Sequence, residues 1–465
     1  MADQGSPSPE SPRGGFRVFL STLGCAKNSI DSEGLAGLVA AGGHHLVEDP
    51  ERAEVVLVNT CGFIDPARRE TVQEALDLAE LKETGDMKGL VLTGCLVARS
   101  ANELAEAMPE VDAFVDFAAY PRVADIVSEV GAGTLEQRIQ GEPGTRFDPA
   151  WWDATMAASP RIRFGRAPWA YVKIAEGCDR GCTFCAIPLM RGKFRSRDIA
   201  TVTSEIEHLA AQGVSEISLV SQDSVMWGRD TNEGDLAGLI RHLETLEGIR
   251  RIRLMYLHPQ GVTDELIDTI VASDKVVNYF DLSLQHVSPA VLKRMGRWGG
   301  SDRFRRMIER IRGLDPMAGL RATFIMGFPG ESDDDADEVA EFIESVDLDW
   351  IGTFTYSREE GTRSHDLDDQ VPEVVARERA ERIGSLADSA MERRARVVLG
   401  ATVEVLVERY DLQEEAWLGR SQREAPEVDG EIRFTSDVPL TVGSYVPVAI
   451  TEADGADLVG KAVTT

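Results

Sequence analysis

Apolar runs alternate with stretches of helical spacing through the first part of the chain. Apolar runs begin at Arg17, Val55 and Leu90, and a further strand is expected near 113–117. Between them, apolar residues recur at the helical period of about 3.6 residues, over 29–41, 66–81 and 98–107. This order predicts a doubly wound parallel sheet over residues 16–130, in which ligands bind beyond the carboxyl ends of the strands.

The same alternation returns after residues 131–168, where Gly, Pro and Trp break the pattern and indicate a linker. Six strand-like runs are expected at 169–175, 216–221, 251–256, 279–284, 320–326 and 350–356. Helix-like stretches with acidic starts separate most of them, at 201–212, 235–246, 264–272, 302–311 and 333–344. A repeated βα unit predicts a parallel barrel or half-barrel over 169–398.

The pattern changes again near the carboxyl end. A long charged helix is expected at 371–396, followed by short runs of alternating polarity at 402–408, 431–434 and 445–450. These runs predict a small OB-like β-barrel over 399–465. Residues 1–15 are rich in Pro, Ser and Gly and have no apolar core, so we expect a disordered tail there and not a signal peptide.

Composition agrees with a large α/β enzyme of several domains. The chain has 465 residues, 43% of them hydrophobic, which is enough to form more than one core. No apolar stretch approaches the roughly 18 residues that a membrane span needs, so we expect a cytoplasmic protein that binds no membrane. The net charge of −30 opposes non-specific attraction to nucleic acid and favours a basic partner.

Three of the six cysteines stand close together, as Cys178, Cys182 and Cys185. We call them the loop triad, because they follow the first strand expected in the barrel. Three thiolates in eight residues can bind one face of a metal centre and leave a coordination position open. A structural zinc site is the main alternative, but it needs four ligands, and the nearest histidines, His208 and His242, lie outside the loop. Three neighbouring cysteines also cannot all pair as disulfides.

The other cysteines are Cys25, Cys61 and Cys95, and each lies just beyond one of the first three apolar runs. We call them the strand-end triad. The carboxyl ends of parallel strands meet at one edge of a sheet, so these thiols should converge. A glycine stands beside each of them and leaves room for a bulky group. The sequence therefore predicts a second three-cysteine centre.

The spacing of the loop triad resembles the signature of the radical S-adenosylmethionine (SAM) enzymes. This resemblance implies that the loop triad holds a 4Fe-4S cluster, that the iron without a cysteine binds SAM, and that an electron from the cluster cleaves SAM to a 5′-deoxyadenosyl radical. It also implies a partial barrel of six β/α units.

Residues after later strands are candidates for holding SAM, because barrel active sites lie at the carboxyl ends of the strands. They are Gln222 after the second strand, Ser283 and Gln285 after the fourth, and Gly327 after the fifth. Gly327 also fits a tight structural turn, and His286 is more often a structural histidine than an acid or base.

The order of the three blocks, with the cysteines placed as three and three, resembles the methylthiotransferase family over residues 16–463. The motifs that carry this resemblance are Gly24-Cys-Ala-Lys-Asn-Ser-Ile-Asp-Ser-Glu33, Val58-Asn-Thr-Cys-Gly-Phe-Ile64, Ser221-Gln-Asp-Ser224, Leu284-Gln-His286 and the segment 419–430. They look like the branch that methylthiolates the β-carbon of an aspartate in small-subunit ribosomal protein S twelve. The branch that methylthiolates an adenosine in tRNA is the alternative, and a non-catalytic scaffold that binds a cluster or another metal is a third.

The resemblance implies two 4Fe-4S clusters and SAM as cofactors. The loop triad would hold the cluster that makes the radical, and the strand-end triad would hold one whose open iron carries the sulfur. One SAM would methylate that sulfur and a second would generate the radical, so an electron donor and a sulfur donor are implied as partners.

The C-terminal block resembles a TRAM domain, a small barrel that usually binds RNA. Residues 401–465 nevertheless contain five basic residues against thirteen acidic ones. An RNA-binding barrel should be basic. We therefore expect a basic protein as the partner, namely ribosomal protein S twelve, and no direct binding of tRNA.

Overall fold

The computed structural model describes residues 15–141, 153 and 161–463. These fold as two compact units, Met1–Phe164 and Gly165–Thr465. The expected disordered tail lies outside the described residues except for Gly15, and so does most of the expected linker, at 142–152 and 154–160. Among the described residues, no helix has the length and apolar character that crossing a membrane requires.

The first unit is built on a six-stranded parallel sheet of order β2-β1-β3-β4-β5-β6. Its strands are β1 Arg17–Thr22, β2 His45–Leu46, β3 Val55–Thr60, β4 Gly89–Gly94, β5 Ala113–Val115 and β6 Ile139–Gln140. Its α-helices are α1 Ala26–Ala41, α2 Asp65–Ala79, α3 Leu81–Thr84, α4 Cys95–Ala107 and α5 Val123–Ala132. Every residue of β3 and β4 is buried, so both faces of the sheet are covered. The predicted parallel sheet is confirmed, and β6 lies inside the range expected to be linker.

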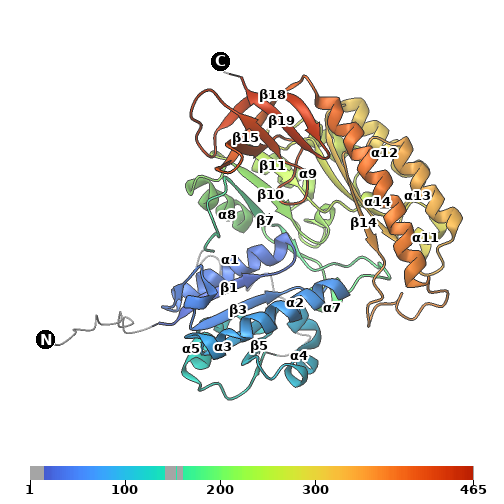
Figure 1. Cartoon of the computed structure of the whole chain (residues 1–465). Coiled ribbons are helices and arrows are strands. Elements are labelled where there is room, and N and C mark those ends of the chain that lie inside the picture. Colours follow the sequence, from blue (N-terminus) through green and yellow to red (C-terminus); the bar gives the residue numbers. More distant parts are fainter. Residues whose placement is uncertain (1–14, 142–152, 154–160, 464–465) are drawn as a thin grey trace. The chain divides into compact units, whose positions relative to one another are not determined.

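The second unit begins with a partial β/α barrel (Figure 1). Its six parallel strands are β7 Trp169–Lys173, β10 Glu216–Val220, β11 Arg251–Leu254, β12 Tyr279–Gln285, β13 Gly319–Met326 and β14 Trp350–Thr355. They pair as β11-β10-β7 and β12-β13-β14. A single bridge joins Leu257, after β11, to Leu282 of β12, and another joins Ile252 of β11 to Val276, just before β12. No pairing joins the described strands β7 and β14, so the barrel stays open there.

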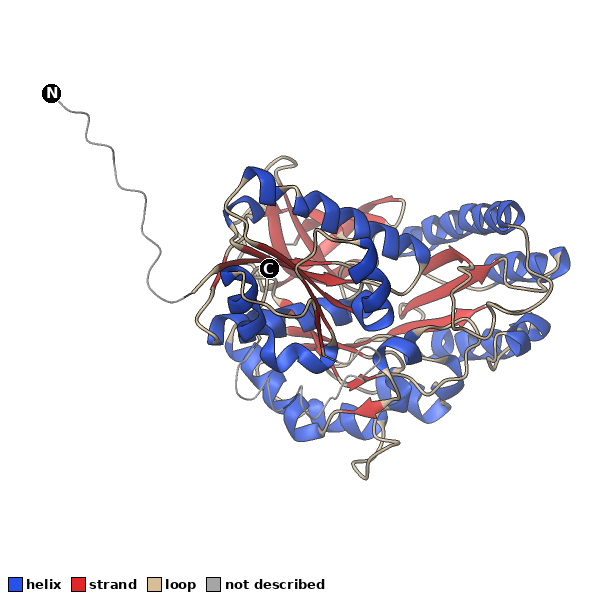
Figure 2. Cartoon of the chain, turned by 90° about the horizontal axis from the view of Figure 1, so that it is seen from below, coloured by secondary structure: helices blue, strands red, loops and turns tan. Residues whose placement is uncertain are grey.

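Helices cover the outside of these strands (Figure 2). They are α8 Ile199–Ala211, α9 Leu236–Leu243, α10 Asp264–Val271, α11 Pro289–Arg294, α12 Ser301–Leu314, α13 Asp333–Ser345 and α14 Glu373–Ala395, while the short helix α7 Ile187–Arg191 belongs to the loop after β7. One apolar core joins the strands to this layer and includes Ile383 and Ala387 of α14. The predicted partial β/α barrel is confirmed.

The C-terminal block is a closed barrel of order β15-β16-β17-β19-β18. Its strands are β15 Thr402–Asp411, β16 Ala416–Arg420, β17 Ile432–Thr435, β18 Tyr445–Asp454 and β19 Asp457–Ala462. The small barrel is confirmed, and two of its strands, β16 and β19, were not expected. Each contains a glycine and only a few apolar residues, so neither has clear alternation.

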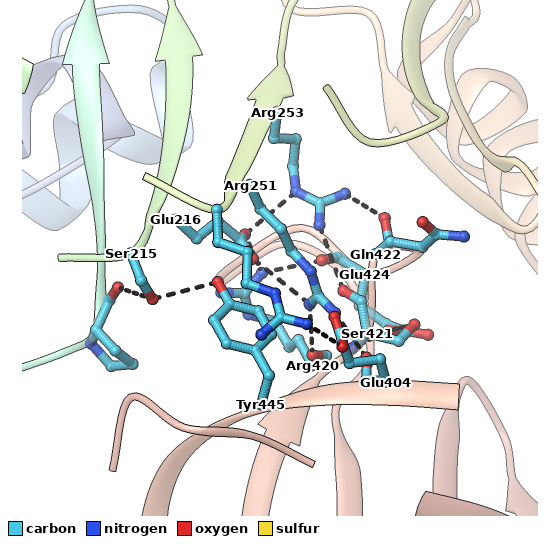
Figure 3. Close-up of polar contacts among 12 residues, drawn as sticks. Ser215, Glu216, Arg251, Arg253, Glu404, Arg420, Ser421, Gln422, Glu424 and Tyr445 are labelled. Carbon is cyan, nitrogen blue, oxygen red and sulfur yellow. Dashed lines mark hydrogen bonds and ion pairs between the residues drawn. The ribbon is translucent and has the colours of Figure 1, made fainter. Parts of the chain in front are cut away.

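The segment between β16 and β17 packs against the amino ends of the larger barrel's strands (Figure 3). Arg420 Nη1 lies 2.8 Å from Glu216 Oε1, and Arg253 Nη1 donates to the Gln422 carbonyl oxygen at 3.0 Å. Further along, the Tyr279 hydroxyl donates to Asp429 Oδ2 at 2.7 Å. The small barrel therefore covers the amino end of the partial barrel, and the carboxyl end, with the loop triad, lies opposite it.

Candidate metal centres

The loop triad lies just beyond the carboxyl end of β7. The backbone N–H of Cys178 donates to the Gly192 carbonyl oxygen at 3.2 Å. Gly177 has φ +75°, and a side chain there would meet the Lys193 carbonyl oxygen at 2.1 Å, so this position requires glycine. A short antiparallel pair, β8 Ala175–Glu176 and β9 Arg195–Ser196, joins the two ends of the loop.

The three thiols of the loop triad are half-buried and free. Burial raises the pKa of Cys178 to about 11 and that of Cys185 to about 12. Both groups are therefore protonated near neutral pH when no metal is bound. A metal binds thiolates, so its uptake would release these protons.

The loop triad offers the thiol ligands that a 4Fe-4S cluster takes, each thiolate bonded to a different iron. Among the residues that the structure describes, no three His, Cys, Asp or Glu side chains are grouped closely enough to hold one metal ion.

Two nitrogen donors point at sulfur atoms of this triad. The backbone nitrogen of Arg180 lies 3.4 Å from Cys178 Sγ, and Arg297 Nη1 lies 3.4 Å from Cys182 Sγ. Burial, together with the Arg297 and Arg180 guanidinium groups, lowers the pKa of His258 to about 2. His258 is therefore neutral, and the charged donors here are arginines.

A buried ion network lies beside the loop triad, on the residues that lead into it. Glu176 Oε2 lies 2.6 Å from Lys173 Nζ and 3.2 Å from Arg191 Nη1. Burial alone would raise the pKa of Glu176, but these two cations lower it to about 2. The Gln222 amide nitrogen donates to the other oxygen of Glu176, while its own Oε1 is buried with no hydrogen-bond partner among the described residues. Gln222 therefore offers a buried acceptor beside the loop.

The other candidates for holding SAM lie at the same carboxyl end. The Ser283 carbonyl oxygen accepts a hydrogen bond from Arg297, and Gln285, with φ +71°, donates to Thr323 Oγ1 at 3.4 Å. The structure thus brings Gln222, Ser283 and Gln285 to one rim.

Gly327 has a packing role in addition to its place on this rim. Its φ is +80°, and a side chain there would meet the Ala376 Cβ atom of α14 at 2.2 Å. Its backbone nitrogen donates to Glu331 Oε2 at 2.8 Å, and His286 Nε2 lies 3.5 Å from the same oxygen. The positive φ and the close contact fit a tight turn, and the fully buried His286 lies beside the carboxylate that this turn binds.

The strand-end triad gathers at the carboxyl ends of three neighbouring strands. Cys25 follows β1, Cys61 follows β3 and Cys95 follows β4. A side chain at Gly24 would meet Cys61 Cβ at 2.9 Å, and one at Gly62 would meet the Cys95 carbonyl carbon at 3.0 Å. The glycines thus allow the three cysteine-bearing turns to approach one another closely.

Two buried asparagines hold these turns together. Asn28 Nδ2 donates to the carbonyl oxygens of Leu23 and Thr60, at 2.7 and 3.0 Å. Cys95 Sγ lies 3.8 Å from Asn28 Oδ1, and Asn59 Nδ2 donates to the Asn28 carbonyl oxygen at 2.9 Å. The sequence analysis did not single out either asparagine. The available signal was the placement of Asn28 three residues after Cys25, one turn into a helix that starts at the strand end.

Comparison with protein families divides the chain as the fold does. Residues 17–116 match the uncharacterized protein family UPF0004, residues 172–343 match the radical SAM superfamily, and residues 399–463 match the TRAM domain. The first region contains the strand-end triad and the second contains the loop triad.

Several curated proteins resemble the chain along nearly its whole length. The ribosomal protein uS12 methylthiotransferase RimO of Trichlorobacter lovleyi is 40% identical, over 96% of this chain and 98% of that protein. The protein of the same name from Heliobacterium modesticaldum is 42% identical, over 96% and 95%. Among solved structures, the radical SAM methyltransferase TsrM of Kitasatospora setae gives a TM-score of 0.57 at 16% identity, over 75% of this chain and 77% of TsrM, which is a likeness of fold.

Proposed function

This chain belongs to the RimO family of ribosomal protein uS12 methylthiotransferases, and from that membership we propose that it places a methylthio group on the β-carbon of an aspartate in uS12. Protein uS12 is protein S twelve of the small ribosomal subunit. The reaction breaks a C–H bond that ordinary acid or base chemistry does not activate, and a sulfur must be held where the carbon radical forms. The proposal therefore requires two centres, SAM, an electron donor and a sulfur donor.

The strand-end triad is the observation that carries this proposal. A radical SAM domain needs the loop triad alone to make its radical, so three more cysteines at adjoining strand ends call for a second centre. All six cysteines of the chain are accounted for in this way. A non-catalytic scaffold would account for the two triads but not for the buried acceptor at Gln222.

Bound at the two triads, 4Fe-4S clusters would supply the one-electron chemistry that cleaves SAM and the iron that carries the sulfur. The residues of the chain bind and position these groups. The loop triad and the strand-end triad would donate thiolates, and the network of Glu176, Lys173 and Arg191 keeps the loop fixed at the barrel rim. We assign contacts with SAM to Gln222, Ser283, Gln285 and Gly327, among which the buried Gln222 Oε1 is the clearest unused acceptor.

The acidic C-terminal barrel supports a basic protein as substrate. Two of its five basic residues, Arg420 and Arg423, are buried against the larger barrel, so they contribute little to the free surface. The half-buried Arg433 and the exposed Lys461 form ion pairs with acidic neighbours. The buried acidic side chains of Glu424 and Asp429 offset the two buried arginines, so the free surface keeps the acidic balance of the residue count, which favours uS12 over tRNA. A ribosomal substrate also places the proposed enzyme in the cytoplasm.

Mass spectrometry of uS12 from cells with and without this gene tests the proposal. We expect the target aspartate to be methylthiolated only when the gene is present, and restored by the wild-type gene but not by a Cys182→Ala copy. Unmodified uS12 in both strains, together with a change in methylthiolated tRNA adenosine, would favour the tRNA branch.

A further inference from the structure

The Arg297 guanidinium lies against the loop triad. Its Nη1 atom lies 3.4 Å from Cys182 Sγ, and its Nη2 atom donates to the Ser283 carbonyl oxygen. The backbone nitrogen of Arg297 donates to the Leu292 carbonyl oxygen at 2.8 Å, where α11 ends. Both the backbone and the planar head of this side chain are therefore fixed, and one of its donors points at a sulfur atom.

The segment that carries Arg297 contacts the cysteine loop at three further points. Thr183 donates to it twice, from its backbone nitrogen to the Met295 carbonyl oxygen and from Oγ1 to the Arg294 carbonyl oxygen, both at 2.9 Å. A side chain at Gly296 would meet the Gly181 carbonyl oxygen at 2.5 Å. The contact between Arg297 and Cys182 is thus part of a continuous interface between two loops.

The charge of Arg297 has no carboxylate partner among the described residues. Its Nε atom is buried and makes no hydrogen bond in this part of the chain. The other nearby guanidinium, that of Arg180, is paired with Asp223 Oδ2 at 2.6 Å. Arg297 is therefore a guanidinium that touches the loop triad and lies outside any ion pair of the described residues.

We propose that Arg297 raises the reduction potential of the cluster bound by the loop triad, by placing a positive charge that has no ion-pair partner, and an N–H donor, beside Cys182 Sγ. The inference rests on the proposed function, because it assumes that this cluster is the one that reduces SAM. Reduction takes one electron from a low-potential one-electron donor and no proton, so the net charge of cluster and three thiolates becomes more negative by one. A fixed cation stabilises that reduced state more than the oxidised one, and N–H···S bonds act in the same direction. Arg297 acts through Cys182 and is a positioning residue.

A redox titration of the full-length chain tests this inference. The strand-end triad is first replaced by alanine, so that only one cluster contributes, and the potential is read by electron paramagnetic resonance without SAM. Arg297→Gln keeps N–H donors but removes the charge. We expect it to lower the equilibrium constant for reduction by about tenfold, which for one electron is about 59 mV toward more negative potential. Arg297→Lys keeps the charge, so its potential should lie closer to that of the unchanged protein.

Arg294→Gln is the matched control. Arg294 belongs to the same segment, and its Nε atom donates to the Pro329 carbonyl oxygen at 2.8 Å without touching a sulfur. Its substitution disturbs the segment but should leave the reduction potential of the cluster unchanged. An unchanged potential in Arg297→Gln, or an equal shift in Arg294→Gln, would overturn the inference.

A second measurement covers the case in which Arg297→Gln loses its iron. Arginine labelled with ¹⁵N only in the guanidinium group should give a nitrogen coupling to the reduced cluster of the chain that retains Arg297, and Arg297→Lys should abolish it. Absence of that coupling also overturns the inference. These outcomes are separate from failure of the proposed function, in which the loop triad of the parent chain would bind no 4Fe-4S cluster at all.

Discussion

Arg420 Nη1 and Glu216 Oε1 lie 2.8 Å apart, and both side chains are buried although 204 residues separate them. Burial would raise the pKa of Glu216, but Arg420, Arg253 and Arg251 hold it below its usual value. The carboxylate therefore stays charged at neutral pH. This pair joins the C-terminal barrel to the amino end of the partial β/α barrel, and the two barrels belong to one compact unit.

Removing the cation from this pair should lower the free energy of unfolding. Arg420→Met leaves Glu216 and Glu408 buried with fewer cations, and breaking such a pair costs about 3 kcal/mol. Chemical denaturation, followed by circular dichroism, measures this loss of unfolding free energy. Arg409→Met is the matched control, because its ion pair with Glu431 is largely exposed and should be worth less than about 1 kcal/mol. Equal losses in the two variants would contradict the structural role of Arg420.

The sequence predicted the elements whose pattern is regular. The parallel strands ending before Cys25, Cys61 and Cys95 and the six strands of the partial barrel are apolar runs of ordinary length, and they lie where they were expected. Two-residue strands such as β6 and the glycine-containing β16 have too few apolar positions to carry a period, so the sequence did not reveal them.

The sequence predicted the site residues whose type alone fixes their chemistry. It did not predict those whose role depends on how distant loops meet in the fold. Cysteine spacing indicated the loop triad, and the position of three cysteines just beyond apolar runs indicated the strand-end triad. Arg297 reaches Cys182 across 115 residues, and its role depends on how two loops meet, which no local pattern shows. Asn28 is hidden for a similar reason, because an asparagine in the first turn of a helix usually serves only its own backbone.

Iron content should follow the two triads. After anaerobic reconstitution we expect about eight iron atoms per chain, because each three-cysteine centre can hold one 4Fe-4S cluster. Replacing the whole strand-end triad by alanine should leave about four, measured by iron analysis alongside absorption spectra. An unaltered chain that binds only about four irons, or that holds zinc in equal amount to protein as isolated, would be incompatible with two clusters.

Asp116 should make stability depend on pH. Its carboxyl is fully buried, and burial raises its pKa to about 6, although it accepts a hydrogen bond from the Ala118 backbone nitrogen. The folded state thus binds a proton that the unfolded state releases near pH 4. The protonated Asp116 carboxyl makes its full contribution to the free energy of unfolding below about pH 4. That contribution is lost as the pH rises to about 6, and the loss reaches about 3 kcal/mol.

Asp116→Asn should therefore raise the melting temperature at pH 7.5 and change it less at pH 5, as measured by calorimetry. The exposed Asp125→Asn removes the same charge from the first turn of α5 and serves as the control. A melting temperature that Asp116→Asn leaves unchanged, or lowers, at pH 7.5 would show that burial does not penalise this carboxylate.

Association with uS12 should weaken as salt concentration rises, because opposite charges draw the partners together. Replacing exposed acidic residues of the small barrel by lysine, at Glu415, Glu452 and Asp454, should raise KM for uS12 more than it lowers kcat. Glu427 is left in place, since it accepts a hydrogen bond from the Tyr171 hydroxyl at the junction of the two barrels. Binding that is insensitive to both salt and charge reversal would argue against electrostatic capture.

If the two triads have different roles, substitutions in each triad should abolish different products. Cys182→Ala removes a ligand of the cluster that reduces SAM, so both 5′-deoxyadenosine and modified uS12 should disappear. Cys61→Ala should still form 5′-deoxyadenosine but give no methylthiolated aspartate. Circular dichroism and thermal melting accompany both assays, because loss of a bound cluster also lowers stability.

The most direct measurement is mass spectrometry of both products from a chain in which Cys25, Cys61 and Cys95 are all alanine. We expect 5′-deoxyadenosine from the loop triad, no methylthio group on uS12, and a folded protein by circular dichroism. Methylthiolated uS12 from this well-folded variant would contradict the claim that the strand-end triad carries the sulfur.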